Sequence, residues 1–397
     1  MEAVELLTSH LVVGGAALAR QTDGRVVFVS GALPGERVSA ELRTTKKDFA
    51  TAAVRAVVEA SPDRVEPPCE AWHRGCGGCD WQHIDPAAQL RHKTAIVREA
   101  LTRTARLVDP AVVAAGSVPP WGYRTTVRLA AAGSSIGFRS RRSHDIVPIE
   151  ACPVASAAVN GEIRREAVSR RDRRDAGSSA SDEVVIRASV ATGAINSSAG
   201  GGPNVLQEDV SGHRLRVSLG SFFQSSPRAA ELLVDAVASA CGDVDMPSSH
   251  VVDAYGGIGL FGATVAASAR QLTLLEGSAP ACADARVNLA GREARVIHAR
   301  VEDWTVVPAD LVIADPARHG LDRRAAATLT ATGAPVLVLI SCDTGSLARD
   351  ARILVEHGYR HDGTQVIDAF PNTSHIETVT RFVIGPSNIG ASDARTP

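Results

Sequence analysis

From about residue 221 the chain alternates short apolar segments with segments of helical length, and this alternation constrains the fold more than any other feature. The apolar segments read HVVDAYGG, QLTLLEG, ARVIHAR, DLVIADP and PVLVLISCD. Continuous Val, Leu and Ile runs are typical of parallel strands that are buried on both faces, with helices as crossovers. Ligands bind such sheets at the carboxyl ends of the strands. The pattern predicts an α/β domain with its site at that edge.

The chain before this domain has a different texture. Between residues 4 and 60, Val-rich runs with period-two stretches alternate with turn pairs such as Asp23–Gly24, which is typical of a small antiparallel barrel. Strand-like and low-complexity pieces mix between about 110 and 220, which indicates a second, partly β subdomain. We therefore expect a barrel at 1–61, a cysteine segment and central α+β subdomain at 62–220, the α/β domain at 221–386 and a disordered tail at 387–397.

Three of the seven cysteines lie close together, as Cys69, Cys76 and Cys79 in PPCEAWHRGCGGCDWQH, and Cys152 is a fourth candidate ligand. An odd number of cysteines in a long chain does not suit a secreted disulfide framework, so metal binding or catalysis is expected. Three thiols in a Gly-rich loop favour a four-iron, four-sulfur cluster, because glycine lets backbone amides approach the sulfurs. Structural zinc, which usually uses two short Cys pairs, and unrelated buried thiols are the alternative interpretations.

A cofactor site is indicated at the first strand of the α/β domain. Asp253 ends that strand, and Gly257 and Gly259 lie in the turn before a helix, where small residues let a cofactor approach the backbone. Glu276 ends the next strand, and its carboxylate can accept both hydroxyls of a ribose. A nicotinamide dinucleotide and S-adenosylmethionine fit this pairing equally well. A glycine turn followed by a helix-capping acid is the purely structural alternative.

The later strands favour the methyl donor. Asp315 ends one strand and Cys342 ends the next, and residues 343–345 read as a helix start. We expect the helix N-terminus to stabilise the thiolate of Cys342. Hydride transfer needs no such nucleophile. Taken without further motifs, a cysteine at the end of a buried strand is more often a small core residue than a nucleophile.

The charge of the chain restricts where a nucleic acid could bind. The formal net charge is −2, whereas nucleic-acid-binding domains are usually basic, so any such surface must be local. No signal peptide or membrane-spanning run is recognisable, and we expect a cytoplasmic protein without membrane association. Three local basic runs are candidates, although such runs are usually solvated faces: Arg43, Lys46 and Lys47; Arg139, Arg141 and Arg142; and Arg170–Arg174.

Taken in order, the motifs resemble the bacterial uracil-5 RNA methyltransferase family along the whole chain. VVGGAALAR, GRVVFVSGALPGERV and KKDFATAAV are similar to the family's TRAM domain, an OB-like RNA-binding barrel, and WGYRTTVRLA resembles a segment of the central domain. DAYGGIGLF, LLEGS, IADPARHG, SCDTGSLARD and SHIETVTRF match its cofactor loop, ribose acid, Asp-Pro, nucleophile and final motifs. The resemblance implies a Rossmann-like class I methyltransferase domain joined to a TRAM barrel and a central α+β subdomain.

The resemblance also implies roles for single residues. Cys342 would be the nucleophile and Glu377 the general base. Cys69, Cys76, Cys79 and Cys152 would hold a 4Fe-4S cluster. The implied cofactor-binding residues are Gln224, Asp253, Tyr255, Gly257, Gly259, Glu276 and Asp315.

The sequence departs from the family motifs at three places. Gly256 stands where many relatives have Cys, and Ala317 stands where a second Pro is common. The nucleophile motif reads Cys-Asp-Thr, with Asp343 and Thr344, where Cys-Asn-Pro is common. None of these changes removes a group that the expected chemistry consumes.

Carbon 5 of uracil is too weak a nucleophile to attack a methylsulfonium, so the expected mechanism is covalent. The Cys342 thiolate adds to carbon 6, the resulting enolate takes the methyl group at carbon 5, and Glu377 removes the carbon-5 proton before elimination. Asp315 and its neighbours would hold the base. The target base must leave its stack. Candidate stacking partners, for which core packing is the alternative role, are Phe222, Phe223 and Phe370.

The expected partners are S-adenosylmethionine and a structured ribosomal or transfer RNA, with the chain acting as a monomer. Two other function classes remain open at this point. One is a non-catalytic or redox-sensing iron–sulfur RNA-binding protein, and the other is a nicotinamide oxidoreductase. The sequence does not identify the RNA or the uridine.

Overall fold

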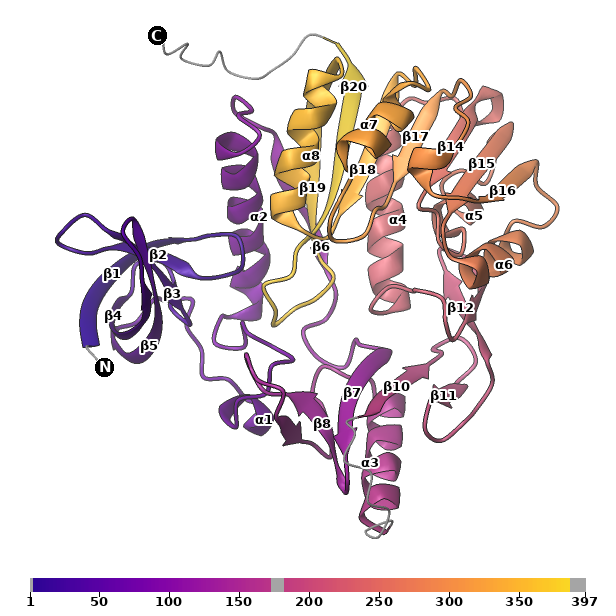
Figure 1. The fold of residues 1–397 in the computed structure, drawn as a ribbon. Helices are drawn as coiled ribbons and strands as arrows, with labels where there is room; N and C mark the ends of the chain where they lie inside the picture. The colour runs from indigo at the N-terminus through magenta and orange to yellow at the C-terminus, as the bar shows by residue number, and fades with distance from the viewer. Residues whose placement is uncertain (1–2, 173–181, 386–397) are drawn as a thin grey trace, which may run out of the picture.

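A computed structural model describes residues 3–172 and 182–385 (Figure 1). The predicted tail at 387–397 and two arginines of the third basic run, Arg173 and Arg174, lie outside these residues. The described chain forms a barrel, a smaller sheet below it in the view, and a large sheet flanked by helices.

The N-terminal barrel is closed, in the strand order β1-β2-β3-β5-β4, which confirms the predicted OB-like unit. Alternate residues of its strands, such as Ala17, Ala19, Val27 and Val29, are fully enclosed, as the period-two pattern requires. A Gly with φ of +87° makes the turn at Gly24. The strands are β1 (Ala3–Leu11), β2 (Ala17–Arg20), β3 (Val26–Ser30), β4 (Arg37–Thr45) and β5 (Phe49–Glu59).

The central subdomain is a five-stranded sheet with one long helix against it. The strand order is β11-β10-β7-β8-β9, and α3 packs on β8, β10 and β11. The short α1 (Glu70–His73) belongs to the cysteine segment, and a hairpin of β12 (Val205–Val210) and β13 (His213–Ser218) follows the sheet. The other elements are β7 (Thr126–Ala132), β8 (Ser135–Arg139), β9 (Ile146–Pro148), α3 (Ala157–Asp172), β10 (Asp182–Ala188) and β11 (Ile195–Ser197).

The large sheet has eight strands in the order β16-β15-β14-β17-β18-β20-β19-β6. The strands from β16 to β18 in this order run parallel, as the apolar runs predicted, whereas β20 is antiparallel to both its neighbours. The strands are β6 (Val112–Ser117), β14 (His250–Ala254), β15 (Gln271–Glu276), β16 (Ala294–His298), β17 (Leu311–Ala314), β18 (Val336–Ser341), β19 (Tyr359–Asp368) and β20 (Glu377–Ile384).

Helices cover both faces of this sheet. One apolar core joins α2, α7 and α8 to the sheet and to the barrel, and another joins α4, α5 and α6 to its other face. Two short 3-10 turns, Met246–Ser248 and Val301–Asp303, connect elements. The helices are α2 (Pro86–Arg103), α4 (Pro227–Cys241), α5 (Leu260–Ala263), α6 (Ala279–Asn288), α7 (Arg323–Thr330) and α8 (Thr344–Glu356).

The large sheet takes two elements from the 62–220 segment. β6 pairs in parallel with β19, and α2 packs on β6, β19 and α8. The apolar side chains of α2, among them Ile96, Val97 and Leu101, are buried in the core beneath the sheet. An amphipathic helix must bury such a face against a partner, and here the partner lies in the C-terminal half of the chain.

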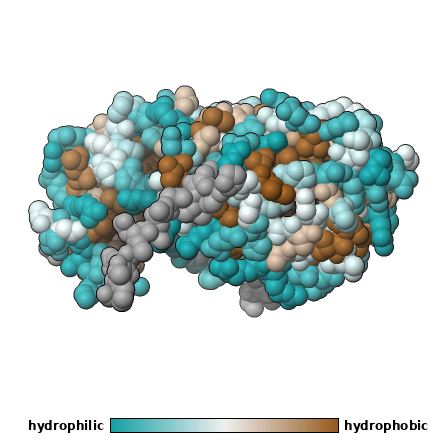
Figure 2. Space-filling model, turned by 90° about the horizontal axis from the view of Figure 1, so that it is seen from above, coloured by the Kyte–Doolittle hydropathy of each residue, from teal (hydrophilic) through white to brown (hydrophobic). Residues whose placement is uncertain are grey.

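The edge of the large sheet at which β20 ends faces the viewer in Figure 2. Polar side chains prevail there, and the apolar ones form separate patches. Within the described residues, none of the helices is both long enough and apolar enough to cross a membrane.

Candidate active site

The residues singled out in the α/β domain lie on neighbouring strands of the large sheet. Glu276 ends β15, Asp253 lies one residue before the end of β14, and Asp315 follows β17. Cys342 follows β18, and Glu377 begins the antiparallel β20. Ser341 pairs with Thr378, so Cys342 and Glu377 occupy the next register step. All five residues therefore meet at the carboxyl edge, in strand order from the acid of β15 to the acid of β20.

The β14 and β15 side of this edge has the features of a cofactor site. Glu276 accepts hydrogen bonds from the amides of Gly257 (3.0 Å) and Ser278 (2.6 Å). Asp253 is fully buried, and one of its carboxylate oxygens accepts from the Gly262 amide at 3.2 Å. The other oxygen has no partner among the described residues. Burial, and then the charges of Asp315 and Glu276, raise the pKa of Asp253 to about 7.

The glycine-rich turn brings backbone close to this carboxylate pair. Tyr255, Gly257 and Gly259 all have positive φ, of 59°, 55° and 84°, a conformation that glycine adopts without strain and tyrosine rarely. Tyr255 is only half-buried and packs against the core. A Cβ on Gly257 would meet nothing within 4 Å, so a ligand can approach the backbone of this turn before α5.

Gln224 approaches the same edge from the segment between β13 and α4. It is buried, and the chain beside it is held by Ser225, whose hydroxyl donates to the Ala369 carbonyl at 2.9 Å. The aromatic residues nearby differ in exposure. Phe223 is buried in the core, whereas Phe222 is 71% exposed, and Phe370 lies 5.6 Å from the Arg124 guanidinium. Phe222 is therefore the side chain among these that is free to contact a large ligand.

Asp315, Cys342 and Glu377 influence one another electrostatically. Burial raises the pKa of Asp315 to about 7. Burial, and then the charge of Asp315, raise the pKa of Glu377 to about 8, while Lys93 and Arg318 oppose this rise. Near neutral pH, Glu377 is thus mostly protonated and Asp315 only partly ionised, and such raised pKa values are typical of functional sites.

The expected stabilisation of the Cys342 thiolate by the helix start is wrong. Burial, followed by the charges of Glu377 and Asp315, raises the pKa of Cys342 to about 12. The helix α8 does begin at Thr344, but its N-cap is Asp343, whose carboxylate accepts from the Ser346 amide at 2.7 Å. The first turn of the helix is therefore capped by a carboxylate next to the thiol.

The departures from the family motifs fit their surroundings. A side chain on Gly256 would place its Cβ 2.6 Å from Leu274 Cγ and 3.0 Å from Asp253 Cγ, so this turn is packed for glycine. The carbonyl of Ala317 accepts from the Gly320 amide at 2.7 Å and closes a turn. Asp343 caps α8 as an Asn would.

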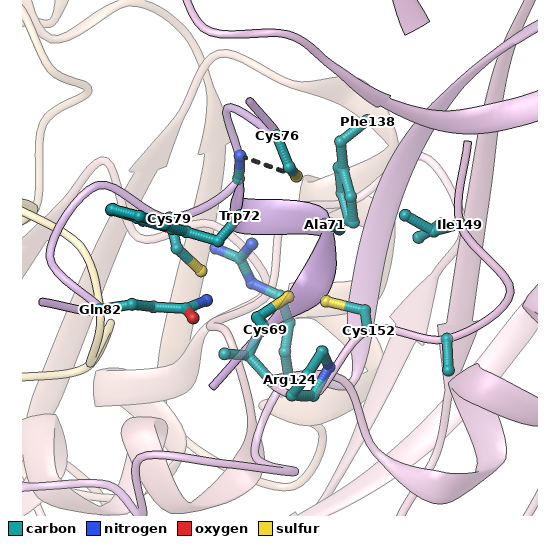
Figure 3. A pocket seen from close by; sticks show the side chains of 14 residues that line it. Cys69, Ala71, Trp72, Cys76, Cys79, Gln82, Arg124, Phe138, Ile149 and Cys152 are labelled. Atoms are coloured by element: carbon teal, nitrogen blue, oxygen red, sulfur yellow. Dashed lines mark hydrogen bonds between the residues drawn. The ribbon is translucent and has the colours of Figure 1, made fainter. Parts of the chain in front are cut away.

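The four cysteines predicted as ligands line one pocket between the cysteine segment and the central sheet. Figure 3 shows that Cys69 and Cys152 point toward one another and that the sulfur of Cys79 faces the same space. Cys76 accepts from the Gly78 amide at 3.4 Å. Burial raises the pKa of Cys79 to about 12. In the arrangement seen, none of the described His, Cys, Asp and Glu side chains form a group of three or more that could hold a metal ion.

A groove on the outside of the barrel combines aromatic and basic side chains. Phe28 and Phe49 meet edge to face with ring centroids 6.0 Å apart, and Lys46 Nζ lies 5.3 Å from the Phe49 ring centre. Arg20 and Arg103 line the same groove, as do Asp48 and several smaller residues. Lys46 was predicted as part of a basic run, whereas the aromatic pair was not singled out, although both rings sit at outward positions of the period-two pattern.

Comparison with known proteins identifies the family. No family model matches the chain. An uncharacterized RNA methyltransferase of Streptomyces avermitilis is 33% identical over 428 residues, which cover 95% of this chain and 97% of that protein. The 23S rRNA (uracil(1939)-C(5))-methyltransferase RlmD of Halomonas elongata is 31% identical over 433 residues, 94% of this chain and 88% of the relative. The chain belongs to the RNA uracil-C5 methyltransferase family.

A solved structure shows the same fold for this RNA methyltransferase. The tRNA (uracil-54, C5)-methyltransferase of Pyrococcus abyssi, crystallised with S-adenosyl-L-homocysteine, superposes with a TM-score of 0.75 at 23% identity. The match covers 96% of this chain and 100% of that one, so barrel, central subdomain and large sheet are all included. Membership of an RNA methyltransferase family decides against a nicotinamide oxidoreductase.

The structure of this methyltransferase brings two further charged residues toward the edge that sequence reasoning missed. Lys93 of α2 is fully buried and pairs with Asp368 at 2.7 Å. Arg318, in the loop after β17, opposes the rise in the pKa of both Cys342 and Glu377. Lys93 could have been found from the sequence because it is a charged residue on the apolar face of a helix. Arg318 could have been found because it lies within the Asp-Pro motif.

Proposed function

We propose that the protein transfers the methyl group of S-adenosylmethionine to carbon 5 of one uridine in a structured ribosomal or transfer RNA. Cys342 is the nucleophile and Glu377 the general base. The observation that carries the proposal is the meeting of Asp315, Cys342 and Glu377 at one sheet edge, beside the glycine turn and Glu276. A nucleophile, a base and a cofactor site are the parts that covalent methyl transfer needs.

The cofactor would lie across the β14 and β15 strand ends. Glu276 already accepts two backbone amides and has lone pairs left for ribose hydroxyls. The free oxygen of Asp253 and the buried amide of Gln224 are further polar groups at this edge. Tyr255, Gly257 and Gly259 form the turn over which the adenosine would pass, and Asp315 separates this half of the site from the thiol.

Two proton positions must change before the reaction can run. The Cys342 thiol must lose its proton before it adds to carbon 6, and Glu377 must be a carboxylate to accept the carbon-5 proton. The protein groups around them raise both pKa values. The positive sulfonium of the bound cofactor would favour both charged forms, because an opposite charge nearby stabilises an anion. Binding of the cofactor would thus prepare the site for addition.

The barrel would bind the RNA at a place distant from the reacting uridine. Its outer groove offers the Phe28 and Phe49 rings for stacking, and Arg20 of the barrel and Arg103 of α2 for phosphates. Lys46 adds a cation beside the Phe49 ring. Unpaired bases stack on aromatic side chains, and basic groups around them bind the backbone. Phe222, an exposed ring two residues before Gln224, would contact the flipped base.

The cysteine pocket would hold a four-iron, four-sulfur cluster. Four thiols line it, three of them buried, and apolar side chains such as Phe138 and Ile149 make up much of the remainder. Four thiolates in an apolar shell suit such a cluster, and zinc remains the alternative for the same donors. When bound, such a cluster would supply electron storage or structural cross-linking, and no step of the proposed methyl transfer depends on it.

Mapping of 5-methyluridine tests the proposed function directly. Nucleosides from ribosomal and transfer RNA of cells with and without the gene would be compared by mass spectrometry, fragment by fragment. We expect one 5-methyluridine to disappear in the cells without the gene and to return when the purified protein is incubated with that RNA and S-adenosylmethionine. An identical 5-methyluridine pattern in both strains, with no transfer in vitro, contradicts the proposal.

A further inference from the structure

The loop between β19 and β20, residues 369–376, leads directly into Glu377 and extends below the sheet, beside α2 (Figure 1). The part of this loop around residues 372–374 is bound to the cysteine segment. The amide and hydroxyl of Ser374 donate to the two carboxylate oxygens of Asp80, at 2.8 and 2.6 Å. The Trp81 amide donates to the Asn372 carbonyl at 3.0 Å. Asp80 and Trp81 come immediately after Cys79, so this part of the loop is attached to the segment that carries the thiols.

Helix α2 binds the same loop from a second side. Gln89 accepts from the Asn372 amide at 2.6 Å and donates to the Asn372 side-chain oxygen at 3.3 Å and to the Ile84 carbonyl at 2.9 Å. Lys93, one helical turn later, pairs with Asp368 at 2.7 Å and donates to the Phe370 carbonyl at 3.2 Å. Gln89, Lys93, Asp368 and Asn372 are all buried. These hydrogen bonds are therefore shielded from water, and such bonds are stronger in the protein interior than in water.

The loop has little room to move at its tip. Asn372 has a φ of 67°, and its side chain donates to the Pro120 carbonyl at 2.7 Å. The barrel contributes Gly15, where a Cβ would lie 2.7 Å from Ser374 Cβ and 2.5 Å from Trp81 Nε1. Three parts of the chain that are distant in sequence thus close around residues 369–376.

A buried ion pair such as Lys93–Asp368 contributes little net stability compared with apolar packing, so its use points to positioning. The pair lies at the start of the loop, and the Asp80–Ser374 contact lies three residues before Glu377. Together these contacts fix both ends of the loop 369–376, and the residue that follows the loop, Glu377, must lie close to the thiol of Cys342. A misplacement of about 1 Å at a reacting group is enough to slow catalysis strongly.

We propose that Asp80, Gln89 and Lys93 are positioning residues for the methyl transfer, which hold the loop 369–376 so that Glu377 lies opposite Cys342. The cysteine segment thereby supports the base through Asp80, in addition to any group that its thiols bind. This inference rests on the proposed role of Glu377 as the base.

Asp80→Ala tests the inference, because Asp80 is exposed and its replacement leaves the buried contacts of the loop in place. Asp209→Ala, which removes an exposed aspartate paired with Arg214 on the β12–β13 hairpin, is the matched control. Two quantities would be measured on the full-length protein. One is hydrogen exchange of the amides in 369–376, and the other is the rate at which a protein–RNA adduct forms and then breaks down.

We expect Asp80→Ala to exchange about tenfold faster across the loop, as loss of a charge-assisted hydrogen-bond pair predicts. Adduct formation should be unchanged, and adduct breakdown should slow by a similar factor. Asp80→Asn keeps one acceptor for the Ser374 amide, so its rates of loop exchange and adduct breakdown should lie between those of Asp80→Ala and the unaltered protein. Asp209→Ala should match the unaltered protein in both rates. Binding of S-adenosylhomocysteine should be equal in all four proteins.

Faster loop exchange in Asp80→Ala with unchanged adduct breakdown would overturn the positioning role, and so would unchanged exchange. Glu377→Gln distinguishes this failure from failure of the proposed function. If Glu377→Gln traps the adduct while Asp80→Ala behaves like the control, the base is correctly assigned and the inference is wrong. If Glu377→Gln shows no adduct, the assignment of the base itself fails.

Discussion

Replacing Glu377 with Gln separates the first half of the proposed reaction from the second. Gln has nearly the same shape as Glu but cannot accept the proton from carbon 5, whereas Cys342 can still add and the methyl group can still be transferred. We therefore expect Glu377→Gln to accumulate a methylated, covalent protein–RNA adduct that survives denaturant. A denaturing gel would show it as a retarded band, and mass spectrometry would show the added methyl group.

The pKa of Glu377 sets the size of the accompanying pH effect. With a pKa of about 8, about one Glu377 side chain in ten is a carboxylate at pH 7 and about nine in ten at pH 9. Breakdown of the adduct formed by the unaltered protein should accelerate roughly tenfold over this range and then level off. In Glu377→Gln the slow residual breakdown should lack this dependence.

The same pKa predicts a stability difference. A carboxyl group with a pKa of about 8 in the folded protein and 4.5 in the unfolded chain destabilises the fold as pH rises between these values, because the unfolded chain loses its proton first. The effect on the free energy of unfolding is roughly 3 kcal/mol at pH 7 and approaches roughly 5 kcal/mol above pH 8. Gln does not titrate, so Glu377→Gln should unfold at a higher temperature than the unaltered protein at pH 8 and at nearly the same temperature at pH 5.

Thermal unfolding at the two pH values, with the exposed Glu293→Gln as control, measures this difference. The control should show no pH-dependent gain. If Glu377→Gln forms no adduct and its stability gain is the same at pH 5 and pH 8, then Glu377 is neither the base nor a carboxyl with a raised pKa, and the reasoning is refuted.

Further experiments probe other parts of the molecule. Cys342→Ala should bind RNA and S-adenosylhomocysteine in equilibrium titrations yet transfer no methyl group, and turnover in this variant would exclude the covalent mechanism. Protein purified without oxygen should be brown and show a broad visible absorption band that fades on oxidation. A colourless protein with stoichiometric zinc would show that the four thiols bind zinc and not an iron–sulfur cluster. Phe49→Ala and Lys46→Ala should each weaken RNA binding by about 1 kcal/mol in filter or fluorescence assays without changing cofactor binding, and equal loss of both would make the barrel structural. Lys93→Met should lower the free energy of unfolding by roughly 3–5 kcal/mol, because Asp368 is left buried without its partner, and Lys93→Met with Asp368→Asn should recover part of it in denaturant titrations.

Much of the fold follows from local patterns in the sequence. The continuous apolar runs before Asp253, Asp315 and Cys342 identify buried parallel strands, since only such strands lack a polar face. Parallel strands share a carboxyl edge, so residues that end different strands are expected together even though they are far apart in the chain. The period-two runs of the first 60 residues likewise predict the barrel. These conclusions need only the repeat of the side chains and the direction of the strands.

Other features depend on pairings that no local pattern contains. The antiparallel β20 places Glu377 beside Cys342, but no local sequence pattern predicts which strands β20 pairs with. Burial and nearby carboxylates raise the pKa of Cys342, whereas the helix start alone predicted the opposite, because a pKa depends on every charge around the group. The contact of Lys93 with Asp368 joins residues 275 positions apart. The sequence by itself determined the strands, the edge and the chemistry-bearing residues, and only the tertiary structure decided how these residues are charged and what holds them, because electrostatics and packing sum over the whole fold.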